Sequence, residues 1–487
     1  MEIVRTEVSD RMTESLEIER KFDTPDDFRL PPLDAIGRPG KPHAFDLDAT
    51  YYDTADLRLM RRRLTLRRRL GGHDAGWHLK RPAGGDRTER QLPDAPQVPP
   101  ELLDQIRAII RDQPLQPVVR LQTRRIEVGL VSGDDEVSIA IDTVHASRYG
   151  RTMTETRWSE LEIELVKGSR GLIDRLAAEV EAAGARPSAY ASKLSRALGD
   201  AVPAKPEAGA TGAARALAGY LRTQRDELIA NDPLVRGFDA DGVHDMRVAV
   251  RRLRSALGIF RKPDSTHLRA ELKWLSDLIG AVRDTDVLAD ELIGDIAVTA
   301  PDLVPSKVTR RIRQRLRRDT AAARDALRAA LNGPRYFALL DELDALVDGE
   351  PVEVSRTWLH KRTRRRLAAA DAELMAALVS RDDAELHEAR KSYKKARYAV
   401  EVAGPGKGRT LARRLKELQD ILGAHQDAVV AAELLKELAD EAEASSEPEF
   451  GLGVLYAHQQ QQAADRSAEV PAAYARARKR KIRRWLG

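Results

Sequence analysis

The apolar residues of this chain repeat with one period before residue 203 and with another after residue 212. Short segments of the first part, such as "LEIERKF" and "SELEIEL", alternate apolar and charged residues, which is typical of β-strands. The later Ala-, Leu-, Arg- and Glu-rich segments have the 3.6-residue period of helices. Residues 203–212, "PAKPEAGATG", have neither period and predict a linker. A chain of 487 residues exceeds one core, so we expect a strand-rich domain followed by an all-helical domain, an α+β protein overall.

Charged residues gather on one face of the predicted strands. Glu17, Glu19 and Lys21 alternate with apolar residues and therefore share a face, as do Glu160, Glu162 and Glu164. The segments between them offer further charges at alternate positions: Arg67, Arg69, Lys80, Arg87, Glu89, Asp142, and either Arg124 or Arg125, depending on the register.

A solvated face of an ordinary sheet is the simplest explanation of this pattern. Both signs of charge recur on several strands, however, which favours a closed barrel with the charges inside. Unpaired buried charge is costly, so such a barrel must contain water, metal and a polyanion. Carboxylates bind hard cations such as Mg²⁺ or Mn²⁺, and arginine and lysine bind phosphate oxygens. The pattern therefore indicates phosphoryl chemistry.

The segment Glu17-Ile-Glu19-Arg-Lys21 resembles the Glu-x-Glu-x-Lys signature of CYTH domains, the triphosphate tunnel metalloenzymes. The resemblance covers residues 14–200 and includes "GWHLKRP", "ELEIEL" and "ASKLSRAL". It implies an antiparallel eight-stranded tunnel that binds triphosphates. It also implies roles for individual residues: metal ligands Glu17, Glu19, Glu162, Glu164 and Asp142; catalytic residues Glu17, Glu19 and Lys21; phosphate ligands Lys21, Arg67, Arg69, Lys80, Arg124 and Lys193; and a supporting carboxylate, Glu89.

The helical part contains an internal repeat. "VHDMRVAVRRLRSAL" begins at Val243, and the similar "LHEARKSYKKARYAV" begins at Leu386, an offset of 143 residues. The same offset relates the downstream "LIGAVRDTDVL" and "LQDILGAHQDA". A match held over more than 40 residues predicts two similar helical bundles about a pseudo-twofold axis.

Each repeat aligns one histidine and three cations on one helix face, because steps of three and four residues keep side chains together. The members are His244, Arg247, Arg251 and Arg254, and then His387, Arg390, Lys394 and Arg397. This region, residues 213–480, resembles the CHAD domain, which implies that these eight residues bind polyphosphate. Asp284 and Asp427 follow the two histidines at equal spacing and could orient them.

Composition limits the remaining possibilities. The chain has no cysteine, which excludes disulfides and thiolate chemistry and favours a reducing compartment. No signal peptide or membrane-spanning segment is expected, so we predict a cytoplasmic protein, with association with polyphosphate granules left open. Aromatics make up only 5%, which disfavours single-stranded nucleic acid as a partner. Dimerisation is left open.

Together these patterns and the two resemblances imply metal-dependent hydrolysis of inorganic triphosphate or short polyphosphate, with Mg²⁺ or Mn²⁺ as cofactor, and polyphosphate binding by the helices. Two alternatives remain: a polyphosphate-binding protein without catalysis and, less favoured, a protein that binds nucleic acid through its basic helices.

Overall fold

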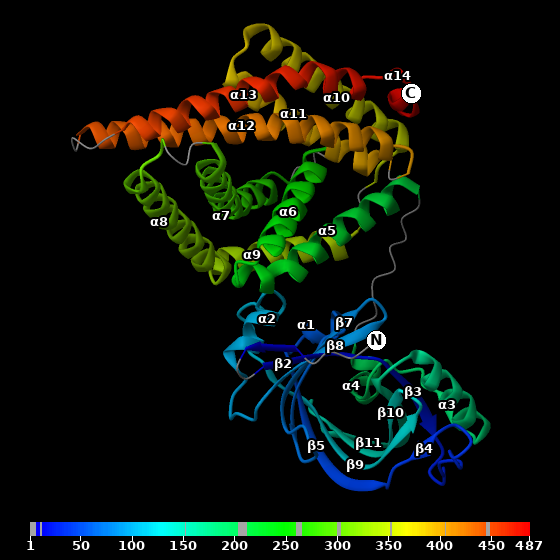
Figure 1. Cartoon of the computed structure of the whole chain (residues 1–487). Coiled ribbons are helices and arrows are strands. Elements are labelled where there is room, and N and C mark those ends of the chain that lie inside the picture. Colours follow the sequence, from blue (N-terminus) through cyan, green and yellow to red (C-terminus); the bar gives the residue numbers. More distant parts are fainter. Residues whose placement is uncertain are drawn as a thin grey trace. The chain divides into compact units, whose positions relative to one another are not determined.

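A computed structural model of the chain forms two compact units, Met1–Lys205 and Pro206–Gly487 (Figure 1). The structure describes residues 6–9, 12–150, 152–202, 212–259, 265–299, 303–350, 353–404, 406–444 and 449–487. The predicted linker lies almost wholly outside the described residues, since only residue 212 of it is described.

The N-terminal unit is built on one antiparallel sheet of twelve strands. Eleven of them follow the order β1-β2-β8-β7-β6-β5-β9-β10-β11-β3-β12, and β4 pairs with β9 beside this path. The bounds are β1 Thr6–Ser9, β2 Met12–Glu17, β3 Glu19–Thr24, β4 Arg38–Pro39, β5 His43–Asp53, β6 Thr65–Leu70, β7 Gly76–Ala83, β8 Asp86–Leu92, β9 Gln116–Ser132, β10 Asp135–Arg148, β11 Thr154–Lys167 and β12 Arg186–Pro187.

The predicted count of eight strands is not confirmed, because the sheet has more strands and its end strands do not pair with each other. Two consecutive strands nevertheless lie far apart in the strand order. Only Ile18 separates β2 from β3, yet β2 pairs with β8 and β3 pairs with β11. The chain around Ile18 therefore connects two distant parts of the sheet, and it carries Glu17 and Glu19 on either side.

Two apolar clusters cover opposite faces of this sheet. Leu161 and Ile163 of β11 pack against α3 (Arg170–Ala182). Trp158, which points to the other face, packs against α4 (Lys193–Leu198) together with Val144 of β10. The face that carries Trp158 also carries Glu160, Glu162 and Glu164, because these residues alternate with the α3-facing ones. We call it the charged face.

Shorter helices complete the N-terminal unit: α1 Arg58–Arg61, α2 Pro100–Ile110 and the 3₁₀ turn Gly199–Ala201. The C-terminal unit is helical, with α5 Gly212–Arg236, α6 Ala240–Ile259, α7 Ser265–Thr299, α8 Ser306–Leu331, α9 Pro334–Asp348, α10 Arg356–Ser380, α11 Asp383–Ala403, α12 Arg409–Ala444, α13 Phe450–Ala477, α14 Arg480–Arg483 and the 3₁₀ turn Arg484–Leu486. The coarse fold prediction, an antiparallel sheet followed by helices, is confirmed.

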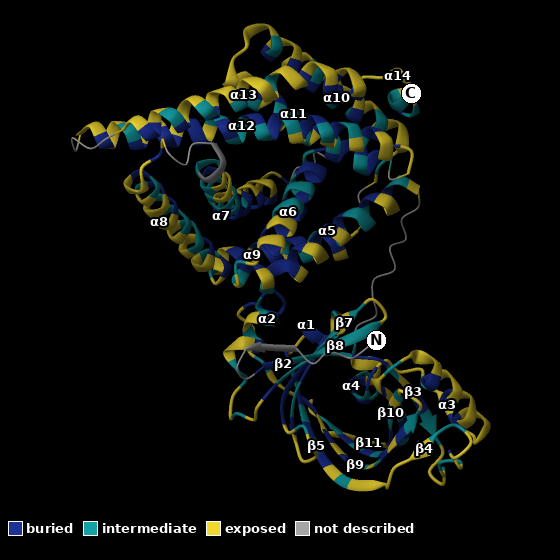
Figure 2. Ribbon diagram, in the orientation of Figure 1, coloured by how far each residue is buried: buried dark blue, intermediate teal, exposed yellow. Residues whose placement is uncertain are grey.

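The internal repeat is visible as four pairs of helices. Helices α5, α6, α7 and α8 correspond in order to α10, α11, α12 and α13, and the members of each pair begin 143 or 144 residues apart. Within each set, successive helices pack together, and α6 also contacts α11. Leu253, Leu275 and Leu418 are buried where these helices pack. Figure 2 shows buried and exposed residues alternating along the helices. No helix among the described residues is both long and apolar enough to cross a bilayer.

Packing of β11 against α3 should hold the charged face in place. Leu161→Ala, at a fully buried position, should lower the free energy of unfolding by about 2–5 kcal/mol through lost burial and a residual cavity. Val166→Ala on the same strand, where the side chain is 45% exposed, should change it by less than about 1 kcal/mol. Urea unfolding followed by circular dichroism measures both, and equal losses would contradict this account of the core.

Candidate functional site

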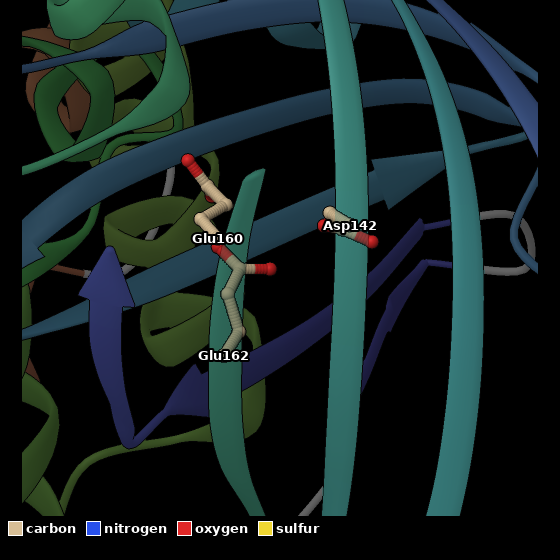
Figure 3. Close-up of side chains that lie close together, drawn as sticks. All are labelled: Asp142, Glu160 and Glu162. Atoms are coloured by element: carbon tan, nitrogen blue, oxygen red, sulfur yellow. The ribbon is translucent and has the colours of Figure 1, made fainter. Parts of the chain in front are cut away.

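A lysine connects three carboxylates on the charged face. Lys193 Nζ lies 3.0 Å from Asp142, 2.6 Å from Glu160 and 2.7 Å from Glu162. Figure 3 shows the three carboxylates on the neighbouring strands β10 and β11. Lys193 is the first residue of α4, whose start is fixed because Ser192 accepts a hydrogen bond from the backbone N–H of Ser195. The helix cap therefore holds the ammonium group at this cluster.

A second set of contacts surrounds Glu162. Lys21 Nζ donates to Glu162 at 2.5 Å and lies 3.0 Å from Glu19. Arg125 donates to both oxygens of Asp142, at 2.8 and 2.7 Å, and to Glu162 at 2.8 Å. The side chain of Glu162 is only 12% exposed, and its neighbours Lys193, Lys21 and Arg125 hold its pKa well below the ordinary value despite burial.

The strands β6 to β8 and β2 supply a third set. Lys80 Nζ lies 2.5 Å from Glu17 and 3.6 Å from Glu89. Arg67 contacts Glu89 at 3.5 Å and donates to the hydroxyl oxygen of Tyr51 at 3.3 Å. Charges of opposite sign thus alternate across the charged face, and nearly every charge has a partner of the other sign.

Glu17 is the least compensated carboxylate of this group. Its side chain is buried, and its Oε2 atom has no hydrogen-bond partner among the described residues. Burial, together with the nearby carboxylates Glu89 and Glu19, raises its pKa to about 7, although Lys80 opposes the shift. Additional positive charge would be most favourable here.

The carboxylates of the charged face could hold a hard cation. Oxygens of Asp142, Glu160 and Glu162 lie within 4.8 Å of one another, the only such group of three found in the described part of the chain. Lys193, Lys21 and Arg125 already neutralise this group, whereas Glu17 has an unpartnered oxygen. The donor set of oxygens alone fits Mg²⁺ or Mn²⁺. Glu17 offers the oxygen that such an ion could take without displacing an ammonium group.

Most predicted tunnel residues lie on or point toward this face: Glu17, Glu19, Lys21, Arg67, Arg69, Lys80, Glu89, Asp142, Glu162, Glu164 and Lys193. Arg69 forms an ion pair with Asp74. Glu164 is exposed to solvent. The side chains of Glu19, Arg67 and Glu162 are between 12% and 15% exposed, so the charges are enclosed by protein and are not spread over an outer surface.

Arg124, which was expected to be a phosphate ligand, does not lie on the charged face. The side chain of Arg124 is 68% exposed and faces Asp46 on the opposite side of the sheet. Arg125 occupies the charged face instead, because it lies opposite Asp142 in the antiparallel pairing of β9 with β10. The two arginines are adjacent in sequence, so the register of β9 decides which of them lies on the charged face.

Some residues that the structure brings to the site had no predicted role. Alternation placed Glu160 on the face of Glu162 and Glu164, but only the other two were expected to bind metal. Tyr51 and His78 gave no such signal. His78 is fully buried; its Nε2 faces the carbonyl oxygen of Asp74 at 2.8 Å and its Nδ1 faces Glu89 at 2.9 Å. A carbonyl oxygen only accepts, so Nε2 is the donor in that contact, and a hydrogen bond between Nδ1 and Glu89 requires a further proton on one of these two groups.

The C-terminal unit gathers four cations from both repeats, which we call the central basic cluster: Arg247 and Arg251 of α6, and Arg390 and Lys394 of α11. Asp284 of α7 and Asp427 of α12 are the acidic groups nearest to it. Burial, followed by the three arginines, lowers the pKa of Lys394 to about 6. The cluster therefore has excess positive charge.

Two glycines at equivalent positions make room for this cluster. A β-carbon at Gly280 would lie 3.5 Å from an Nη atom of Arg247, and one at Gly423 would lie 3.2 Å from an Nη atom of Arg390. The guanidinium groups thus lie directly over the backbones of α7 and α12. Both glycines and both arginines are related by the offset of 143 residues, so the two repeats build the cluster in the same way.

The other four predicted polyphosphate ligands are not members of the central basic cluster. His244 is exposed, and Asp284 binds Arg247 at 2.7 and 3.2 Å, so it does not orient the histidine as expected. Gln426 hydrogen-bonds to His387. Arg397 donates to Glu401 at 2.6 Å and to Gln419 at 3.0 Å. Arg254 is half-buried on α6.

Comparison with known proteins agrees with this architecture. The sequence matches the CYTH domain over residues 15–196 and the CHAD domain over residues 219–436. The chain belongs to the family of proteins in which a CYTH domain precedes a CHAD domain. CYTH domains act on triphosphates, so the enclosed charged face lies in the domain with that chemistry.

A relative of the same length range is the uncharacterized protein Rv2226 of Mycobacterium tuberculosis (strain ATCC 25618 / H37Rv), 36% identical over 92% of this chain and 93% of its own. Among solved structures, the CHAD domain of the plant Ricinus communis is 27% identical, with a TM-score of 0.43, over 56% of this chain and 96% of that one. PptA from Streptomyces chartreusis is 22% identical, with a TM-score of 0.47, over 54% and 99%.

The raised pKa of Glu17 should make the CYTH domain less stable as the pH rises. Between about 4.5 and 7 the folded protein holds a proton that the unfolded chain has released, so the free energy of unfolding falls across this range. Glu17→Gln removes this dependence, which is at most about 3 kcal/mol for a shift of this size. Urea unfolding without metal at pH 5 and pH 8 measures it.

Glu14→Gln is the control for this experiment, because Glu14 lies on the same strand and pairs with Arg90 at 3.1 Å. It should keep the pH dependence of the parent protein. Parallel pH dependence of the parent protein and Glu17→Gln would show that Glu17 is not protonated in the folded state.

Proposed function

We propose that the CYTH domain, over residues 14–200, hydrolyses inorganic triphosphate or a short polyphosphate with Mg²⁺ or Mn²⁺. The proposal depends mainly on one observation: buried carboxylates and buried cations alternate on the charged face, and among the described residues the Oε2 atom of Glu17 has no hydrogen-bond partner. Binding of a metal and a polyanion together can satisfy both sets of charges.

The two sets of charges neutralise each other, as in the contacts of Lys21 with Glu162 and of Lys80 with Glu17. A divalent cation would be held by Glu17, Glu19, Glu162 and Glu164. Phosphate oxygens would then take the released cations, Lys21, Arg67, Lys80, Arg125 and Lys193. Because each ligand frees the groups that the other needs, metal and triphosphate should strengthen each other's binding.

The proposed chemistry divides between these groups. A bound divalent cation supplies Lewis-acid polarisation of a phosphoryl oxygen. The guanidinium groups of Arg67 and Arg125 stabilise negative charge on the phosphate oxygens, and Arg125 is oriented by Asp142. Without metal the pKa of Glu17 is about 7, so binding of a cation to this carboxylate near neutral pH should release a proton.

Adjacent arginines provide a matched test of this site. Arg125→Gln should lower the rate of phosphate release from triphosphate by about 100-fold or more, since it removes a donor on the charged face. Arg124→Gln removes the same charge from the outer surface and should leave the rate unchanged. Phosphate release is measured with Mg²⁺ and with Mn²⁺, and Glu17→Ala should abolish it.

Absence of phosphate release by the parent protein with either metal would overturn the hydrolase proposal. If the parent protein still binds triphosphate, the alternative of a binding protein without catalysis holds. Equal effects of Arg124→Gln and Arg125→Gln would contradict the assignment of the charged face as the site.

We further propose that the CHAD domain, over residues 213–480, binds polyphosphate at the central basic cluster. The cluster combines four half-buried cations with few acidic neighbours, and binding of a linear polyanion there should weaken steeply with salt. Because both domains belong to one chain, bound polyphosphate raises the concentration of substrate available to the CYTH domain. Nucleic acid is a weaker candidate, and polyphosphate should displace DNA at fixed salt.

Lys394 should make polyphosphate binding depend on protons. Its lowered pKa, about 6, means that most of this lysine is neutral at pH 7.5, and a neighbouring phosphate would raise the pKa and draw in a proton. Calorimetric titration in two buffers of different ionisation enthalpy should show uptake of up to about one proton.

Lys394→Arg should remove this uptake, because the guanidinium is always charged. Lys395→Arg, at the adjacent exposed position, is the control and should retain it. Equal proton uptake in all three proteins would assign the effect to another group.

A further inference from the structure

The basic stripe of α6 continues beyond the residues predicted from sequence. His244, Arg247, Arg251 and Arg254 are separated by three, four and three residues, so a further step of four reaches Gly258 on the same face. The corresponding position of α11 is Glu401. The two repeats therefore match along the stripe and differ at its end, where one has no side chain and the other has a carboxylate.

Arginines from two other helices occupy the place of the missing side chain at Gly258. A β-carbon there would lie 3.3 Å from an Nη atom of Arg366, on α10, and 3.6 Å from Nε and Nη of Arg269, on α7. Arg362 lies one turn before Arg366 on α10 and influences it electrostatically. Three guanidinium groups thus extend the stripe where α6 itself contributes none.

This end of the stripe has uncompensated positive charge. No carboxylate of the described residues lies within 4 Å of the charged nitrogens of Arg269, Arg362 or Arg366 in an ion pair. Burial, then Arg269 and Arg362, lowers the pKa of Arg366. Like charges that gather without acidic partners are stabilised by a bound anion.

The equivalent end of α11 is neutralised. Glu401 lies 2.6 Å from Arg397 and 3.3 Å from Arg252, which belongs to α6. One carboxylate thus engages two arginines, including the last member of the α11 stripe. A polyanion that followed α11 would meet a negative charge at the position where α6 offers Arg269 and Arg366.

We propose that a polyphosphate chain leaves the central basic cluster in one direction, along α6 and over Gly258, to a second anion subsite formed by Arg269, Arg362 and Arg366. The proposal rests on polyphosphate binding by the CHAD domain. From Arg251 to Gly258 is about two helical turns, roughly 10 Å at 1.5 Å per residue. A linear chain can occupy both places, whereas a single phosphate group cannot.

Gly258→Glu tests the direction, because it places at the end of α6 the residue that α11 has at Glu401. The new side chain must displace only the flexible end of Arg366, so the fold should persist. Without divalent cations, it should weaken binding of long-chain polyphosphate about tenfold and leave binding of tripolyphosphate within about twofold. Arg366→Gln should act in the same sense.

Two controls separate charge from position. Arg317→Gln removes one exposed positive charge from α8 and should leave both affinities unchanged. Gly258→Ala adds a methyl group without charge and should have a smaller effect than Gly258→Glu. Circular dichroism melting confirms that each variant is folded.

The results distinguish this inference from the proposed function. If the parent protein binds no polyphosphate, the proposed function fails. If it binds, but Gly258→Glu and Arg366→Gln bind long chains as tightly as the parent protein, the second subsite is overturned. If Glu401→Gln, and not Gly258→Glu, governs long-chain affinity, the chain follows α11 and the direction proposed here is wrong.

Discussion

Mutual neutralisation of buried charges is the constraint on which the CYTH domain depends. Lys193 contacts three carboxylates, and Arg125 contacts two of the same three. Buried ion pairs often contribute little net stability, because the loss of hydration offsets the attraction, although removing one partner is strongly destabilising. An apolar filling of this sheet face could be as stable. Stability alone therefore does not account for these charges, which is consistent with the ligand exchange proposed for this face.

Alternation in the sequence predicted which residues share the charged face, because side chains of a strand point alternately to its two sides. It could not choose between Arg124 and Arg125, since the choice requires the pairing of β9 with Asp142 on β10. Nor could it show that the strand around Ile18 pairs with two different neighbours, which changes the strand count. The orientation of the arginines and the number of strands both depend on pairing with strands that are distant in sequence.

In the helical domain the offset of 143 residues predicted the helix pairs, but it did not identify the partner of each aspartate. Asp284 follows both His244 and Arg247 at spacings that recur in the second repeat, so the sequence fits either pairing. Gly280 decides between them, because it lets the guanidinium group of Arg247 approach α7 closely. A search for charged residues alone does not consider Gly280, although the lack of a side chain at this position allows Arg247 to lie close to α7.

Duplication explains the symmetric centre of the CHAD domain, and divergence at a single position explains why its ends differ. Arg247 and Arg390 lie over equivalent glycines, so both repeats contribute alike to the central basic cluster. A symmetric site alone would bind a chain equally well in both directions. Glu401 neutralises one end, while Gly258 admits Arg269 and Arg366 at the other. The duplicated helices thus share a basic centre, but only the end near Gly258 keeps its positive charge, so we expect a bound polyanion to extend toward that end.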